Sequence, residues 1–156
     1  MRARFAPTLV ASALTVTALT GCTFTAEIAN LQPYDPSDGV AITMDDVAVR
    51  NALLITGDGA EANLVMTVVN TTGESVDLRV QYGPSDARQT DIIALPAEPE
   101  LFQVGSDPAN QLVISDDGII AGSLFPVYFQ HGNAQGEIIE VPVLDGTLAE
   151  YELLVP

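Results

Sequence analysis

The sequence lacks lysine and tryptophan, and it contains one cysteine and one histidine among 156 residues. Without lysine, the chain cannot form a Schiff base or supply the phosphate-binding lysine of a P-loop. The single cysteine, Cys22, excludes a disulfide within the chain and a cysteine-rich zinc site. The single histidine, His131, excludes any catalytic arrangement that needs two histidines.

Positive charge is scarce, because the chain contains five arginines and 21 acidic residues, and its formal net charge is −16. Such a chain repels nucleic-acid phosphates and anionic lipid headgroups, so we expect no nucleic-acid partner. A hydrophobic content of 47% fits one compact domain rather than a disordered acidic tail. The acidity is equally compatible with a GC-rich coding bias, a salty habitat or a need to bind cations.

The N-terminus has the organisation of an export signal. Arg2 and Arg4 form a short positive region, and residues 5–18 are apolar, small or weakly polar. This run is shorter and richer in threonine than a membrane span, which needs about 20 strongly apolar residues. Ala3 separates the two arginines, so the pattern favours general export over the twin-arginine route.

Leu19, Thr20, Gly21 and Cys22 follow directly and resemble the lipobox of bacterial lipoproteins. In that family a diacylglycerol is attached to the cysteine thiol, and a dedicated signal peptidase, which recognises the three preceding residues, cuts just before the cysteine. The alternative is an ordinary secretory signal with a cysteine at the cleavage site by chance. The lipobox predicts a protein anchored by lipid on the extracytoplasmic face of the cell membrane, with the affinity supplied by acyl chains rather than by charge.

The sequence predicts three regions: a signal peptide at 1–21, a flexible tether at 22–38 and a β-sandwich domain at 39–156. The tether is small, polar and interrupted by Pro33 and Pro36, and it shows no periodic apolar face. At about 3.3 to 3.6 Å per residue, the stretch from Cys22 to Pro36 reaches roughly 50 Å when fully extended.

Hydrophobic residues recur at every second position beyond residue 39. The clearest strand is 75–82, and 63–70 is a nearly continuous apolar run that predicts a buried strand. Residues 71–74 join the two, so the pattern predicts a hairpin. Further strands are expected at 47–55, 92–95, 101–104, 111–114, 124–130, 137–143 and 148–155.

Two details of these strands are specific predictions. In 47–55, we expect Val49, Leu53 and Ile55 on one face, and in 124–130, Pro126 indicates an edge position or a bulge. Short strands at spacings of roughly 8 to 12 residues, without a long helical pattern, predict an all-β fold, an immunoglobulin-like antiparallel β-sandwich.

The mature part resembles the LpqE-like lipoproteins of high-GC Gram-positive bacteria. The resemblance rests on the lipobox and on four segments: Pro33-Tyr34-Asp35-Pro36, Val47-Ala48-Val49-Arg50-Asn51, Val68-Val69-Asn70-Thr71 and Val141-Pro142-Val143. Those lipoproteins are similar to the PCu(A)C periplasmic copper chaperones. The resemblance therefore implies an immunoglobulin-like or cupredoxin-like sandwich.

The metal motif of the copper chaperones is missing. They hold Cu(I) with methionines and histidines, including a His-x-Met pair near the end, whereas His131 is followed by Gly132 and Asn133. We expect His131 to be a solvated loop residue, Met66 to lie in the core and Met44 to be open to solvent. We therefore expect no metal site and no cofactor.

Other chemistry has little support. Four acidic groups fall between strands, where they are typical turn residues, and none has the spacing of a calcium loop: Asp35 with Asp38, Asp45-Asp46, Asp58 with Glu61, and Asp116-Asp117-Gly118. No Gly-x-Ser-x-Gly motif is present, and no carboxylate pair has a distinctive context. We therefore expect no enzymatic activity.

The sequence favours a lipid-anchored, non-enzymatic module that presents an acidic β-sandwich to an envelope protein or a cell-wall component. Loops near 83–91 and 96–99 are the expected contact surfaces. The alternative is a metal-handling accessory protein related to the periplasmic copper chaperones.

Overall fold

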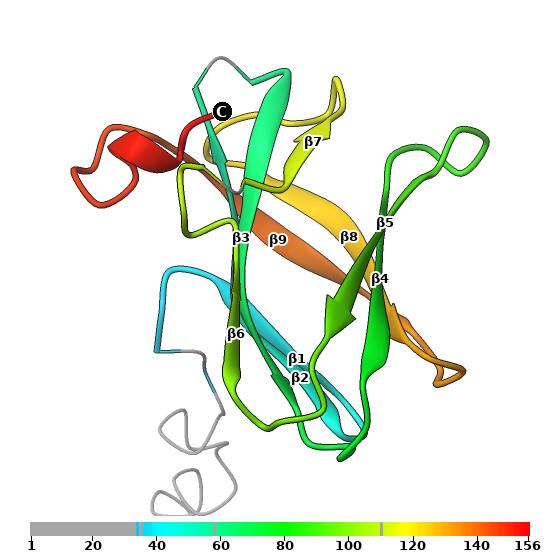
Figure 1. Cartoon of the computed structure of the whole chain (residues 1–156). Helices are drawn as coiled ribbons and strands as arrows, with labels where there is room; N and C mark the ends of the chain where they lie inside the picture. The colour runs from blue at the N-terminus through cyan, green and yellow to red at the C-terminus, as the bar shows by residue number, and fades with distance from the viewer. Residues whose placement is uncertain (1–33, 35, 58, 110) are drawn as a thin grey trace, which may run out of the picture. The chain divides into compact units, whose positions relative to one another are not determined.

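A computed structural model describes residues 34, 36–57, 59–109 and 111–156 (Figure 1). All of these except Tyr34 belong to one compact unit, 35–156. The elements are β1 (Val40–Met44), β2 (Val47–Thr56), β3 (Glu61–Asn70), β4 (Val76–Tyr82), β5 (Gln89–Leu95), β6 (Leu101–Val104), β7 (Val113–Ser115), β8 (Leu124–His131), β9 (Glu137–Asp145) and the 3-10 helix η3 (Glu152–Leu154). No helix among the described residues has the length and apolarity to cross a membrane.

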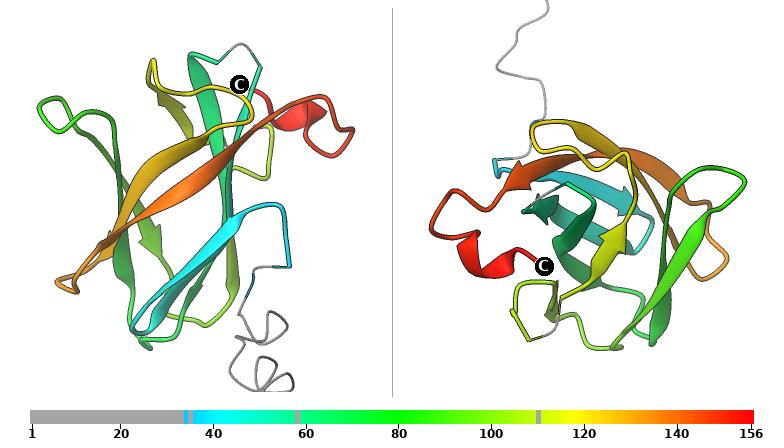
Figure 2. Two further views of the ribbon diagram at one scale, coloured as in Figure 1. Left: turned by 180° about the vertical axis from the view of Figure 1, so that it is seen from behind. Right: turned by 90° about the horizontal axis from the view of Figure 1, so that it is seen from above.

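The strands form two packed layers that share one strand (Figure 2). The first layer contains β1, β2, β3, β6 and β7, and the second has the order β5-β4-β8-β9. β9 pairs antiparallel with β8 and, further along, parallel with β2 at Val143, Leu144 and Asp145. The predicted all-β sandwich is confirmed, with this parallel pairing as its one departure from antiparallel order among the described strands.

The alternating pattern of the sequence places the core between the layers. In β4, Leu78, Val80 and Tyr82 are buried, as the alternation predicts. In β8, Phe125, Val127 and Phe129 are buried in the same way. Side chains on one face of a strand point to the same layer, so these residues meet the inward side chains of β2 and β3 in one cluster.

β2 contains a β-bulge that changes which residues face the core. Asn51 has a φ of 51°, and the register with β3 shifts between Arg50 and Leu53. The core cluster therefore contains Val47, Val49, Ala52 and Leu54. The prediction that Leu53 and Ile55 share the face of Val49 is wrong, because the extra residue moves them to the opposite face of β2.

Asn51 also determines where β1 begins. Its Oδ1 accepts a hydrogen bond of 2.9 Å from the backbone N–H of Gly39. A side chain at Gly39 would clash, because its Cβ would lie 2.6 Å from the carbonyl oxygen of Ala52. The close approach of these two backbones explains why glycine occupies this position.

The predicted hairpin of residues 63–82 is wrong. β3 pairs with β2, β6 and β7, whereas β4 pairs with β5 and β8, so residues 71–75 cross from one layer to the other. Asn70 organises this crossover, because its Oδ1 accepts hydrogen bonds from Thr72 while its Nδ2 donates to the carbonyls of Glu74 and Pro96 at 2.7 and 2.6 Å. The apolar patterns of β3 and β4 fit a hairpin as well as they fit two strands in different layers. In the structure, the inward faces of β3 and β4 meet across the core.

The predicted strand at 148–155 is also wrong. The backbone N–H groups of Tyr151 and Glu152 both donate to the carbonyl of Leu148, which closes a turn before η3. The segment lies over the outer face of β3, where Asn63 Nδ2 donates to the carbonyl of Leu154 at 3.0 Å. Its backbone groups are thus satisfied by local and side-chain hydrogen bonds, without a partner strand.

Pro126 lies beside an unpaired part of β8. β8 is an inner strand, but β4 pairs only with its residues Tyr128–His131. Pro126 pairs with Glu140 of β9 and has no partner in β4. The predicted edge position is therefore confirmed locally, since a proline here removes no hydrogen bond of the β4–β8 ladder.

Candidate functional site

His131 and Met44 meet at one end of the sandwich. His131 is the last residue of β8 and continues its inward face, and Met44 is the last residue of β1. The two side chains are 8% and 4% exposed, respectively, so the predictions of a solvated His131 and an exposed Met44 are wrong. The expectation that Met66 is a core residue is confirmed, since it is 2% exposed.

The hydrogen bond of His131 defines its tautomer. Nε2 lies 2.9 Å from the carbonyl oxygen of Met44. A carbonyl only accepts hydrogen bonds, so Nε2 carries the proton and the neutral ring has its lone pair on Nδ1. Within the described part of the chain, the hydrogen bond of the ring is the one at Nε2, which leaves the Nδ1 lone pair without a hydrogen bond there.

The donor set at this end is small. His131 carries an imidazole and Met44 a thioether, which are ligand types that suit Cu(I), and the contact that joins the two residues is the hydrogen bond from Nε2 to the Met44 carbonyl. Over residues 34, 36–57, 59–109 and 111–156, no group of three or more His, Cys, Asp or Glu side chains can hold a metal ion. The described residues thus offer no ligand cluster of the kind that a zinc or calcium site needs.

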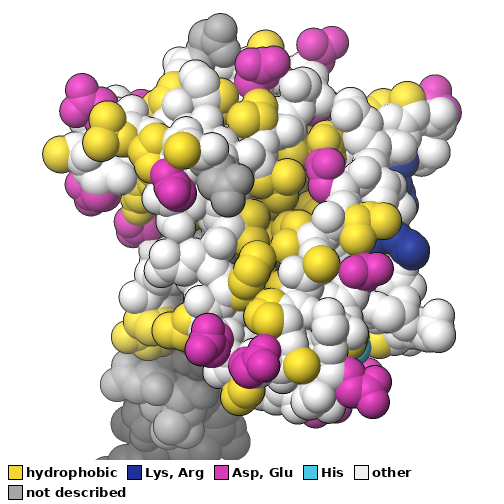
Figure 3. Space-filling model, viewed as in Figure 1, with side chains coloured by type: hydrophobic (Ala, Val, Ile, Leu, Met, Phe, Trp, Pro, Cys, Tyr) yellow, Lys and Arg dark blue, Asp and Glu magenta, His cyan; other side chains and the backbone are white. Residues whose placement is uncertain are grey.

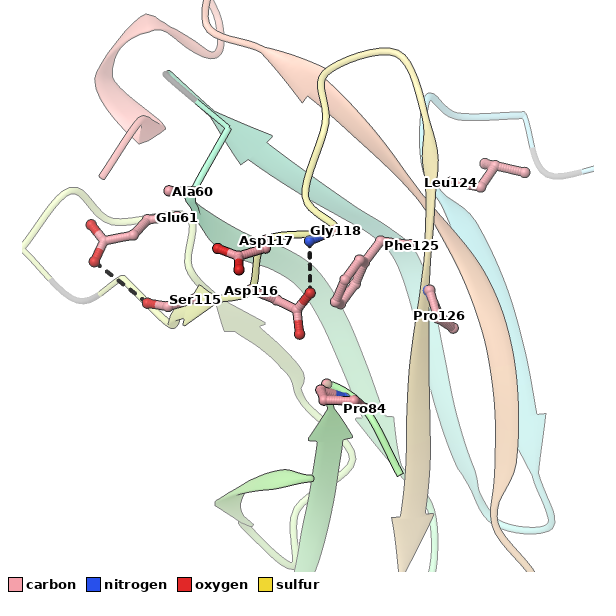
Figure 4. Close-up of a pocket in the computed structure, with 11 residues that line it drawn as sticks. Ala60, Glu61, Pro84, Ser115, Asp116, Asp117, Gly118, Leu124, Phe125 and Pro126 are labelled. Atoms are coloured by element: carbon pink, nitrogen blue, oxygen red, sulfur yellow. Dashed lines mark hydrogen bonds between the residues drawn. The ribbon is translucent and has the colours of Figure 1, made fainter. Parts of the chain in front are cut away.

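An open cleft lies at the opposite end of β8. It has a volume of about 800 Å³ and is bounded by the β4–β5 turn at Gly83 and Pro84, by residues 115–118 after β7 and by the beginning of β8. Phe125 projects from β8 toward Asp116 across the cleft (Figure 4). At about 3.4 Å per residue, Phe125 and His131 are roughly 20 Å apart along the strand, so the cleft and the histidine are separate sites.

The cleft brings together residues that lie far apart in the sequence. The expected contact loop 83–91 contributes Gly83 and Pro84, whereas 96–99 contributes no residue to this cleft. Glu61 and the Asp116-Asp117 pair, both considered as calcium ligands, now line one cleft. The contribution of Phe125 was not predicted, because its alternation with other apolar residues indicates only a core position.

The other acidic groups are dispersed. Asp45 and Asp46 form the exposed turn between β1 and β2, and Asp38 accepts a hydrogen bond from the hydroxyl of Tyr151. Asp35 and Asp58 lie outside the described residues, as do the predicted lipidation residue Cys22 and the predicted peptidase recognition residues Leu19, Thr20 and Gly21. The lipobox stays a prediction.

Two tyrosines hold their protons unusually firmly. Burial, together with the hydrogen bond that the phenol donates to Asp91, raises the pKa of Tyr82 to about 12. The hydrogen bond to Asp38, together with partial burial, raises the pKa of Tyr151 to about 12. Both values exceed the ordinary tyrosine pKa of about 10.

These shifts predict a loss of stability at alkaline pH. Above about pH 10 the unfolded chain releases phenol protons that the folded chain retains until about pH 12, so the free energy of unfolding falls as pH rises through this window. Urea denaturation at intervals between pH 9 and 11.5 measures the slope. Tyr82→Phe is expected to reduce it, and an unchanged slope in this variant would contradict the assignment.

The comparisons with known proteins concern the fold. No protein-family model and no curated protein matches the sequence. A solved structure described as "apo PmoF2 PCuAC domain" matches with 21% identity and a TM-score of 0.50, covering 70% of this chain and 98% of that domain. One described as "Copper-bound PCuAC domain from PmoF2" matches with 20% identity and a TM-score of 0.49, covering 68% of this chain and 98% of that domain. The first likeness confirms that this chain has the cupredoxin-like β fold of a PCuAC domain.

Proposed function

We propose that this protein is a non-enzymatic, lipid-anchored binding protein of the cell envelope, and that it handles copper as its cargo. Support for the location comes from the leader and lipobox of the sequence. Support for copper comes from the fold shared with a PCuAC domain and from the pairing of His131 with Met44. No described residue group suggests a catalytic constellation, which supports binding rather than catalysis.

The observation that carries the copper proposal is the orientation of His131. Its Nε2–H is engaged by the Met44 carbonyl, so the ring is held in the tautomer that presents the Nδ1 lone pair. A ligand that is already oriented loses less conformational entropy on binding. Imidazole and thioether ligands both suit Cu(I), and the strongly negative protein attracts cations.

The His-x-Met pair of the copper chaperones is replaced here. Gly132 and Asn133 follow His131, so the second soft ligand has to come from β1, at Met44. Met44 and Met66 both lie in the core cluster, and Met44 is the candidate because its backbone carbonyl is the hydrogen-bond partner of His131. We therefore propose a site with fewer ligands than in those chaperones, and we expect weaker binding.

Titration with Cu(I) against a competing chelator tests this function. The full chain is used with Cys22→Ser, because a free thiol would bind Cu(I) by itself. We expect binding of one equivalent, with an affinity reduced about ten-fold or more by His131→Ala or by Met44→Leu, since the first removes the only imidazole.

Met66→Leu is the matched control, because it makes the same substitution at a second buried methionine, on β3. A leucine of similar volume is usually tolerated there, so we expect an affinity within about two-fold of the parent. No binding at all would refute copper handling and leave the non-enzymatic binding role without an identified ligand. Stoichiometric binding that survives His131→Ala would refute the assignment of the site to His131.

A further inference from the structure

We propose that the cleft at the beginning of β8 binds a lysine- or arginine-bearing segment of a partner protein. This inference rests on the non-enzymatic binding role proposed above, but it does not depend on copper, because the cleft and His131 lie at opposite ends of β8. The volume of about 800 Å³ is within the range of sites that enclose side chains or small ligands.

Three carboxylates supply the negative charge of the cleft. Asp116 Oδ1 accepts a 2.8 Å hydrogen bond from the N–H of Gly118, which holds the carboxylate in place. Its Oδ2 faces Gly83, since a Cβ at Gly83 would lie 3.4 Å from it. Asp117 is exposed beside it, and Glu61 lies next to Ser115, whose Oγ donates a hydrogen bond of 3.4 Å to its Oε1. The lining contains no basic residue.

The remaining surface of the cleft is apolar. Its apolar lining residues are Ala60, Pro84, Leu124, Phe125 and Pro126, and the ring of Phe125, although only 4% of the residue is exposed, points toward Asp116 (Figure 4). In the space-filling view, hydrophobic side chains gather in a hollow on this face, with acidic side chains around it and basic ones only at the margin (Figure 3). A lysine or arginine matches both features, because its methylene stem packs on apolar surface while its head reaches carboxylates.

The cation has to come from another molecule. The chain contains no lysine, and two of the three described arginines already donate elsewhere, Arg50 to backbone carbonyls of β1 and β2 and Arg79 to Gln130. Arg88 is not part of the lining. A metal ion is a poorer occupant, because the described residues offer no cluster of three acidic, histidine or cysteine ligands.

A pair of short peptides tests the proposal. The probe is acetyl-Ala-Val-Arg-Val-Ala-amide, and its control has citrulline in place of arginine, which keeps the shape and removes the charge. Both are titrated at low salt into the ¹⁵N-labelled full chain carrying Cys22→Ser. We expect the arginine peptide to shift the amide resonances of Gly83, Gly118 and Phe125. We expect the affinity of the citrulline peptide to be lower by a factor of about five or more.

Two double variants distinguish the cleft from the general negative charge. Asp116→Asn with Asp117→Asn is expected to weaken binding about five-fold, because exposed charge pairs contribute modestly. Asp45→Asn with Asp46→Asn removes the same charge from the turn at the other end and is expected to change binding less than two-fold.

The outcomes separate the possible occupants. Equal binding of the citrulline peptide would overturn the requirement for a cation. Equal weakening by both double variants, or shifts spread over the whole surface, would show a non-specific charge effect and overturn the site. The same shifts produced by Ca²⁺ alone would replace the peptide with a metal ion. The Cu(I) titration measures metal binding at His131, which the peptide experiment does not involve. A failure of the peptide proposal therefore leaves the test of the copper proposal unaffected.

Discussion

Asn63→Ala is expected to destabilise the protein by about 3 to 5 kcal/mol. The side chain of Asn63 is fully buried, and it joins three segments. Its Nδ2 donates to the carbonyls of Gly105 at 2.8 Å and Leu154 at 3.0 Å, and its Oδ1 accepts from the N–H of Leu112 at 3.0 Å. Each buried backbone group left without a partner costs about 1 to 3 kcal/mol. A loss of this size is a large part of the total stability of roughly 5 to 15 kcal/mol of a domain.

The measurement is urea denaturation, combined with limited proteolysis of the C-terminal segment. Asn133→Ala is the matched control, because Asn133 is exposed in the β8–β9 loop, and we expect a change below about 0.5 kcal/mol there. The C-terminal segment of Asn63→Ala is expected to be cleaved earlier than the rest of the chain. A parent-like urea midpoint would mean that these hydrogen bonds contribute no net stability.

Cys22→Ala is expected to move the protein almost completely out of the membrane fraction. If a diacylglycerol is attached to Cys22, burial at about 0.8 kcal/mol per CH₂ makes two acyl chains an effectively permanent anchor. The domain itself offers no substitute, since its net negative charge repels anionic headgroups. The variant is expected as an uncleaved precursor or in the soluble fraction, because the thiol that accepts the lipid is absent.

Cell fractionation and intact-mass analysis measure this effect. Thr25→Ala is a suitable control, because it alters a nearby small polar residue and leaves the lipobox unchanged. A parent protein whose Cys22 is a free thiol, or a Cys22→Ala variant that remains membrane-bound, would contradict lipid anchoring.

Most strands were predictable because burial imposes a period of two on them, whereas β1 was not among the predicted strands and 148–155 is not a strand. The range 101–104 agrees with β6 at both ends, and the alternation in β4 and β8 identifies their inward faces correctly. The pairing of the strands was harder to predict from the sequence. An apolar face shows that a strand is half-buried, but it does not show which strand lies beside it. The β3–β4 crossover depends on Asn70, whose partners include the distant Pro96. The bulge at Asn51 depends on a positive φ that Asn tolerates but does not require.

The candidate sites were only partly predictable. Phe125, Val127, Phe129 and His131 alternate without interruption, so extending the strand by one position would have placed His131 in the interior. Its contact with Met44 joins residues 87 positions apart, which no local pattern reveals. The cleft unites Glu61, the turn at Gly83 and the loop at Asp116 through tertiary structure alone. Asn63 carried a usable signal, because an amide inside an apolar strand needs buried partners.

The shared strand β9 connects the two layers of the sandwich. Its first part hydrogen-bonds to β8 and its last part to β2, so the two layers are held together along one side by backbone ladders. On the other side, β5 and β7 are joined by a 3.5 Å contact from Gln89 Nε2 to the carbonyl of Ser115. Because backbone ladders join the layers along β9, whereas a side-chain contact joins β5 to β7, we expect the layers to separate more readily at the edges of β5 and β7 than at β9. Such a separation would change the width of the cleft mouth.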